Sequence, residues 1–85
     1  MTEKRARVDE PLRLGDLARA AGVSTQTVEY YLMVGLIDEE DRTPGGRRLF
    51  SEKTVRRVKL IGQLNKSGYT LRDIREIFRR RLAAE

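Results

Sequence analysis

Apolar residues recur at helical spacing along this chain, in stretches bounded by glycine or by small polar residues. The first stretch places four of them at positions i, i+3, i+4 and i+7, on one helical face: Leu14, Leu17, Ala18 and Ala21. This pattern predicts a helix from about Gly15 to Ala21, with a buried stripe made largely of small side chains. Small residues allow a second helix to cross the first one closely.

Two later stretches repeat the helical pattern. Ser51 is a suitable N-cap for a helix that reaches about Lys66, and Gly68 closes it. Thr70 and Asp73 have the spacing of a capping box, which predicts a further helix from that point. The apolar faces of these two helices are Val55, Val58, Ile61 and Leu64, and Leu71, Ile74, Ile77 and Phe78.

A sharp corner follows the first helix. Gly22 can adopt the left-handed conformation that ends a helix, and Val23 fills the corner. Ser24 is a good N-cap for the next helix, which runs to about Met33 or Val34 and ends at Gly35. Two short helices around such a corner predict a helix-turn-helix.

A small hairpin follows the second helix. Pro44-Gly45-Gly46 is a turn signal, and we predict that residues 37–39 and 48–50 lie near each other as short strands. The acidic run 38–41 is expected to be a solvated loop. The predicted fold class is all-α with a small β-hairpin wing, a winged helix-turn-helix of about four helices. We expect a disordered tail over 1–10, one domain over 11–82, and a C-terminal end over 83–85.

Composition narrows the function classes. The chain has 85 residues and no cysteine or histidine, so disulfides, a transition-metal site and the usual general base are all missing. We predict no enzyme activity, no metal site and no cofactor. No apolar run approaches the length of a membrane span, and we expect a soluble intracellular protein without a membrane partner.

Charge is strongly polarised along the chain. Residues 42–81 hold 13 Lys/Arg and 3 Asp/Glu, a net charge of +10, whereas the remainder holds 5 and 10, a net charge of −5. Such polarity in a small domain indicates a surface for a polyanion. A solvated arginine-rich surface without any partner is the alternative.

The second helix and the wing carry the candidate DNA contacts. The N-terminal half of a recognition helix faces the major groove, where Gln26 can bond an adenine edge. Arginines beside a Gly-rich tip can bind phosphates or enter a minor groove; simple solubility is the alternative. Tyr30 and Tyr31 point about 100° apart on a helix, so one can pack inward while the other reaches a phosphate. The candidates are Ser24, which is more suited to capping, Thr25, Gln26, Thr27, Tyr30, Tyr31, Arg42, Arg47 and Arg48.

Several of these pieces, in this order and spacing, resemble the MerR-type winged helix-turn-helix family. They are Leu14-Gly15-Asp16-Leu17-Ala18, Gly22-Val23-Ser24, Thr27-Val28-x-Tyr30-Tyr31, Gly35-Leu36-Ile37, Arg48-Leu49-Phe50-Ser51 and Gly68-Tyr69-Thr70-Leu71-x-x-Ile74. The resemblance implies a bacterial, sequence-specific transcriptional regulator that binds double-stranded promoter or operator DNA. It implies contacts from Thr25, Gln26, Tyr30 and Arg48, and a cytoplasmic, nucleoid-associated location with RNA polymerase as an indirect partner.

Three positions depart from the family pattern. Arg13 stands where the family often has a threonine or serine, and we expect it to contact a phosphate directly. Glu29 stands where the family usually has arginine, and we expect it to pair with a wing or helix-one arginine; a hydrogen bond accepted from cytosine N4 is the alternative. The chain stops at Glu85, before the long helix through which family members commonly form dimers. A fragment of a longer regulator is the favoured interpretation, and a complete small protein is the other.

An excisionase-like or architectural recombination factor is the main alternative function, because such proteins use similar small winged domains. A protein-interaction module that has lost DNA binding is a third interpretation. Glu29 favours that interpretation, and the basic half of the chain argues against it.

Overall fold

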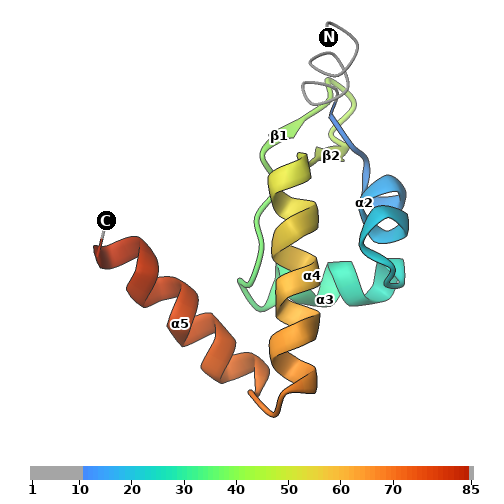
Figure 1. Cartoon of the computed structure of the whole chain (residues 1–85). Helices are drawn as coiled ribbons and strands as arrows, with labels where there is room; N and C mark the ends of the chain where they lie inside the picture. Colours follow the sequence, from blue (N-terminus) through green and yellow to red (C-terminus); the bar gives the residue numbers. More distant parts are fainter. Residues whose placement is uncertain (1–10, 85) are drawn as a thin grey trace, which may run out of the picture.

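Helices dominate the computed structural model, which describes residues 11–84, with side chains over residues 11–80 (Figure 1). The elements are α2 (Leu14–Ala21), α3 (Thr25–Met33), β1 (Asp41–Arg42), β2 (Arg48–Leu49), α4 (Glu52–Lys66) and α5 (Leu71–Ala84). Four helices with a two-stranded antiparallel hairpin confirm the predicted fold class. The tail predicted over residues 1–10 lies outside the described residues.

The corner between α2 and α3 forms at the predicted residues. Gly22 has φ 74°, in the left-handed region, and its N–H donates to the carbonyl oxygen of Arg19 at 3.2 Å. The Ser24 hydroxyl oxygen accepts the N–H of Thr27 at 3.1 Å, which caps α3. Gly35, with φ 82°, follows the end of α3 as predicted. These local signals set the angle at which α3 leaves α2.

The wing differs from the prediction in where its first strand lies. β1 pairs with β2 in the register Asp41↔Leu49 and Arg42↔Arg48, so the predicted strand over 37–39 is wrong. Ile37 is only 2% exposed and belongs to the core, which keeps it out of the hairpin. The turn bonds from the Gly46 N–H to the Thr43 oxygen and from the Thr43 N–H to the Arg47 oxygen, 2.8 and 2.9 Å, fix the register from the tip.

A bridge that the sequence analysis did not predict anchors the wing. Leu12 and Phe50 exchange two backbone hydrogen bonds of 2.8 Å each, so the segment before α2 pairs with the end of the hairpin. Phe50 is 1% exposed. The start of α2 and the wing are therefore tied together through a buried aromatic residue.

The core lies where α4 packs against α2 on one side and α5 on the other (Figure 1). α3 packs against α2, and α5 starts beside the end of α4 and then diverges from it. The capping box that starts α5 is present, with reciprocal bonds between Thr70 and Asp73 of 3.1 and 3.0 Å. The buried apolar residues are Leu17, Ala18, Val28, Tyr31, Leu36, Ile37, Phe50, Val55, Val58, Ile61 and Ile74.

Candidate nucleic-acid interface

The first turn of α3 divides its polar side chains into two sets. The hydroxyls of Ser24 and Thr27 lie 3.0 Å apart, and Ser24 also caps the helix, so both groups are engaged within the protein. Thr25 and Gln26 are exposed and make no side-chain hydrogen bond within residues 11–80. Free polar groups at the start of α3 are thus provided by Thr25 and Gln26.

The paired tyrosines have opposite environments. Tyr30 is 46% exposed, whereas Tyr31 is 8% exposed and packs in the core. Burial raises the pKa of the Tyr31 phenol, which keeps it neutral at physiological pH. We therefore assign Tyr31 to the core, and of these two tyrosines Tyr30 is the one that offers its hydroxyl at the surface.

Glu29 does not make the ion pair expected for it. It is exposed, and within residues 11–80 no arginine lies within salt-bridge distance of its carboxylate. Glu29 lines a shallow depression together with Arg48 and Glu39. The acid that pairs with the wing arginines is Glu39, so the predicted partner is wrong.

Glu39 binds two arginines from opposite strands of the wing. Its carboxylate accepts bonds from Arg42 Nε at 2.5 Å and Arg42 Nη2 at 3.1 Å, and Arg48 Nε lies 3.2 Å from Oε1. Arg42 Nη1 also reaches the carbonyl oxygen of Gly46, at 3.4 Å. The bonds from Arg42, and the nearby charge of Arg48, lower the pKa of the Glu39 carboxyl. The carboxylate therefore stays ionised well into the acid range.

Glu40 also makes contacts that the prediction of a solvated acidic loop did not include. Its Oε2 accepts the hydroxyl protons of Ser51 at 2.6 Å and Thr54 at 2.9 Å. Thr54 is 5% exposed, and it lies in the first turn of α4. Glu40 thus fixes the base of the wing to the N-terminus of α4, and the prediction for this part of the loop is wrong.

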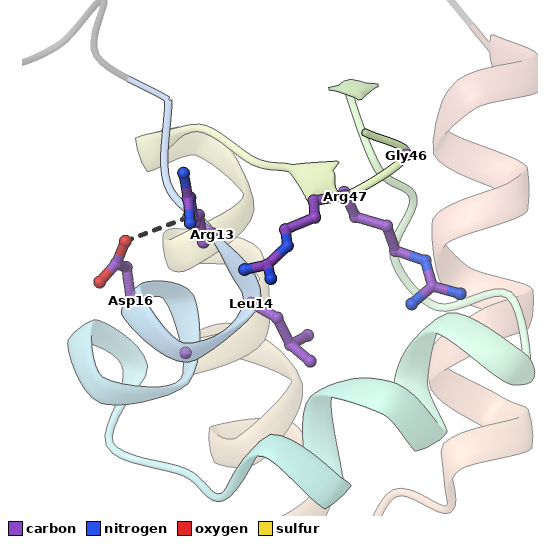
Figure 2. Close-up of a pocket in the computed structure, with 7 residues that line it drawn as sticks. Arg13, Leu14, Asp16, Gly46 and Arg47 are labelled. Carbon is purple, nitrogen blue, oxygen red and sulfur yellow. Dashed lines mark hydrogen bonds between the residues drawn. The ribbon is translucent and has the colours of Figure 1, made fainter. Parts of the chain in front are cut away.

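A cleft of about 460 Å³ separates the start of α2 from the wing. Figure 2 shows Arg13, Leu14 and Asp16 on one side and Gly46 and Arg47 on the other. Arg48 also lines this cleft, and it is the residue that links the cleft to the depression beside α3. Arginines from distant parts of the sequence therefore meet around a single opening.

The start of α2 adds backbone donors to this cleft. The first N–H groups of a helix have no partner within it, and Leu14 and Gly15 lie at this end of α2. The Asp16 carboxylate is occupied by the Arg13 N–H at 3.2 Å and by Arg19 at 2.9 Å. These bonds, the first of them foremost, lower the pKa of Asp16. Asp16 therefore stays ionised, and its negative charge is balanced by the bonds from the Arg13 N–H and the Arg19 guanidinium.

The described residues form neither a metal-binding cluster nor a membrane-spanning helix. No group of three or more acidic side chains there is arranged to hold a metal ion. No helix among them has both the length and the apolar character needed to cross a membrane.

The helix-turn-helix, the wing and α5 together match a known protein family. Residues 12–81 match the family described as MerR HTH family regulatory protein. The chain belongs to the MerR family. The resemblance carried by the helix-turn-helix, wing and α5 motifs is thereby confirmed.

Curated MerR-family relatives are similar over the same region. The mercuric resistance operon regulatory protein of Bacillus cereus is 42% identical over 62 residues, which cover 73% of this chain and 47% of that protein. The HTH-type transcriptional regulator ZntR of Escherichia coli K12 is 37% identical over 73 residues, 86% of this chain and 52% of that protein. The chain thus spans about half the length of these two regulators, and neither of them is named as an enzyme.

Solved MerR-family structures share the fold. PbrR691 from Ralstonia metallidurans CH34, a transcription regulator in complex with lead(II), has a TM-score of 0.79 at 32% identity, covering 87% of this chain and 58% of that chain. A second structure is that of HiNmlR, described as a MerR family regulator lacking the sensor domain and bound to promoter DNA. Its TM-score is 0.82 at 24% identity, and the match covers 89% of this chain and 58% of that chain. At that identity, the HiNmlR match shows the fold alone.

Proposed function

We propose that this MerR-family chain is the sequence-specific DNA-binding part of a bacterial transcriptional regulator. In this proposal α3 enters the major groove, and the wing and the start of α2 rest on the phosphate backbone. The observation that carries it is the position of Arg48, which lines both the depression beside α3 and the arginine-rich cleft. A groove-reading helix and a phosphate-binding surface are thus adjacent, as DNA recognition requires.

Base recognition is assigned to the exposed side chains of α3. Gln26 can present its amide oxygen and NH₂ together to the N6 and N7 positions of an adenine, and such a pair discriminates by about 1–3 kcal/mol against another base. The hydroxyls of Thr25 and Tyr30 can reach a phosphate or a base edge. Ser24 and Thr27 support α3 through the cap rather than through DNA contacts.

Phosphate binding is assigned to the cleft residues Arg13, Arg47 and Arg48. The free N–H groups at the start of α2 reinforce a positive potential there, because a helix N-terminus attracts anions. The net charge of +10 over residues 42–81 supports the same role. A MerR-type position that is often a hydroxyl residue is here Arg13, which can replace a neutral contact with a charged one.

The assembly follows from the proposed role. The mercuric resistance operon regulatory protein and ZntR are named as regulators, which supports regulatory DNA, at a promoter or operator, as the target of this chain. We propose a homodimer on inverted half-sites, formed through an element outside this chain, with RNA polymerase as an indirect partner. The proposed location is the bacterial cytoplasm, on the nucleoid. The relatives named above do not favour the excisionase-like alternative, because they are regulatory proteins.

Enrichment of random duplex DNA on the 85-residue chain, at near-physiological salt, tests the proposal. Sequencing should recover a defined half-site, and an inverted pair of half-sites would indicate a symmetric dimer. A direct repeat would indicate tandem binding instead. Retention of bulk DNA without any enriched sequence would mean that this chain needs the dimerisation element for sequence-specific recognition or that its role is architectural.

A further inference from the structure

The three arginines of the wing are not equivalent in the structure. Arg42 is committed within the protein, because Nε and Nη2 donate to the Glu39 carboxylate and Nη1 lies 3.4 Å from the Gly46 carbonyl oxygen. Arg48 approaches the same carboxylate through Nε alone, at 3.2 Å, which leaves both terminal NH₂ groups unengaged within residues 11–80. Arg47 makes no side-chain bond or ion pair within that range.

The hairpin register explains why an acid is needed at this place. Arg42 and Arg48 are direct cross-strand partners, and like charges opposite each other on a ladder destabilise it. Glu39 lies three residues before Arg42 and contacts both guanidinium groups. Its side chain is 32% exposed, less than that of either arginine, so water screens this charge only in part. The three groups together carry a net charge of +1 rather than +2.

We propose that Glu39 sets the number of phosphates that the wing can bind, by holding Arg42 in an internal ion pair and leaving Arg47 and Arg48 to contact DNA. This inference rests on the proposed DNA-binding function, and it revises the set of wing contacts expected from the sequence. Glu39 acts through Arg42 and Arg48, so it is a positioning residue and makes no DNA contact of its own.

The salt dependence of DNA binding measures the number of phosphates that the protein neutralises. Each neutralised phosphate contributes about 0.9 to the slope of log affinity against log salt. Glu39→Gln frees one positive charge on the wing, so its slope should be steeper than that of the wild type by about 0.9. Between about 50 and about 200 mM salt, the affinity of this variant should fall roughly three- to fourfold more than that of the wild type. Fluorescence anisotropy with a labelled random-sequence duplex provides both values.

Asp38→Asn is the matched control for charge. Asp38 is an exposed neighbour of Glu39, and it forms no ion pair within the described side chains, yet the substitution changes the net charge equally. Its slope should stay close to that of the wild type. An equal increase in the two variants would overturn the inference, because it would reflect overall charge rather than the release of an arginine.

Two charge-neutral double variants separate an internal ion pair from a DNA contact. Glu39→Gln with Arg42→Gln leaves two amides able to hydrogen bond, and it should keep the wild-type slope. Asp38→Asn with Arg47→Gln makes the same change in formal charge, but it should lower the slope by about 0.9, since it removes a phosphate contact. A loss of that size in the first double variant would show that Arg42 contacts DNA, and the inference would be wrong.

The outcomes for the inference and for the proposed function are distinct. A wild-type chain that binds no duplex, even at low salt, would reject the DNA-binding function itself. Suppose instead that the wild-type chain binds with a steep slope, but Glu39→Gln does not steepen it and Glu39→Gln with Arg42→Gln lowers it. This result would reject only the role of Glu39. Circular dichroism of every variant confirms that α2 to α5 are intact, so a change in slope is not caused by unfolding.

Discussion

Glu40→Ala should destabilise the domain more than any other change to an exposed acid in the wing. The Glu40 carboxylate accepts two hydroxyl protons, from Ser51 at 2.6 Å and from Thr54 at 2.9 Å. Thr54 is 5% exposed, so its hydroxyl has little access to water as a substitute, and an unsatisfied buried donor costs about 1–3 kcal/mol. The Ser51 hydroxyl can be rehydrated, which adds only about 0.5 kcal/mol. We expect a total loss of about 2 kcal/mol.

Thermal and urea unfolding followed by circular dichroism measure this loss. For a domain of this size, about 2 kcal/mol corresponds to a decrease in Tm of roughly 8–16 °C. Thr54→Val removes the buried donor, so Glu40→Ala in that background should cost about 1 kcal/mol less than it does alone.

Glu52→Ala is the control for charge at the same helix end. Glu52 is an exposed acid in the first turn of α4, and its loss should cost only about 0.3–1 kcal/mol through the helix dipole. The reasoning would be refuted if Glu40→Ala cost no more than Glu52→Ala. It would also be refuted if the effects of Glu40→Ala and Thr54→Val were simply additive.

Four further substitutions test α3, two glycines and the cap of α5. Gln26→Ala should alter the sequences enriched from random duplexes more than it alters affinity for bulk DNA; an unchanged preference removes Gln26 from base recognition. Gly62→Ala should raise stability by about 0.5–1 kcal/mol, since Gly62 lies inside α4 and an added Cβ meets nothing within 4 Å. Gly22→Ala, at φ 74°, should lower stability by about 1–2 kcal/mol; similar unfolding midpoints for the two variants would contradict this. The bond from the Thr70 N–H lowers the pKa of Asp73, so its stabilisation is present above the unfolded value of 3.8 and is lost as the pH falls through the lower folded value. Asp73→Asn should therefore reduce stability at pH 7 and flatten its loss in acid, as measured by unfolding at several pH values.

Elements specified by nearby residues could be predicted from the sequence. The corner at Gly22 and Ser24 depends on one left-handed residue and one cap bond across three positions. The start of α5 depends on a similar local bond between Thr70 and Asp73. The bridge between Leu12 and Phe50 joins segments 38 positions apart, and no local pattern marks either residue as a strand partner.

The candidate site was predicted less completely, because the fold rather than the local sequence determines which acid pairs with which arginine. Exposure on α3 follows from helical periodicity, but the choice between Tyr30 and Tyr31 as the buried residue depends on how α3 is rotated against the core. The sequence also offered no reason to separate Arg42 from Arg47. Both flank the same turn, but the fold brings the Glu39 carboxylate and the Gly46 carbonyl oxygen to Arg42 and neither of them to Arg47.

Glu29 was expected to pair with an arginine because of the family pattern, whereas the acid that does pair with the wing arginines depends on the strand register. An antiparallel pairing of residues 37–39 with 48–50 sets Glu39 opposite Arg48 but leaves Arg42 outside the paired strands. The observed register sets Arg42 opposite Arg48, and two adjacent guanidinium groups then require a counter-charge. Glu39 provides it from three residues before Arg42. Counting outward from the three-residue loop 44–46 gives this register, because the Thr43 N–H bonds the Arg47 carbonyl oxygen across it. The proposed division of the wing arginines, with Arg42 in an internal ion pair and Arg47 and Arg48 left to contact DNA, therefore depends on where the turn lies.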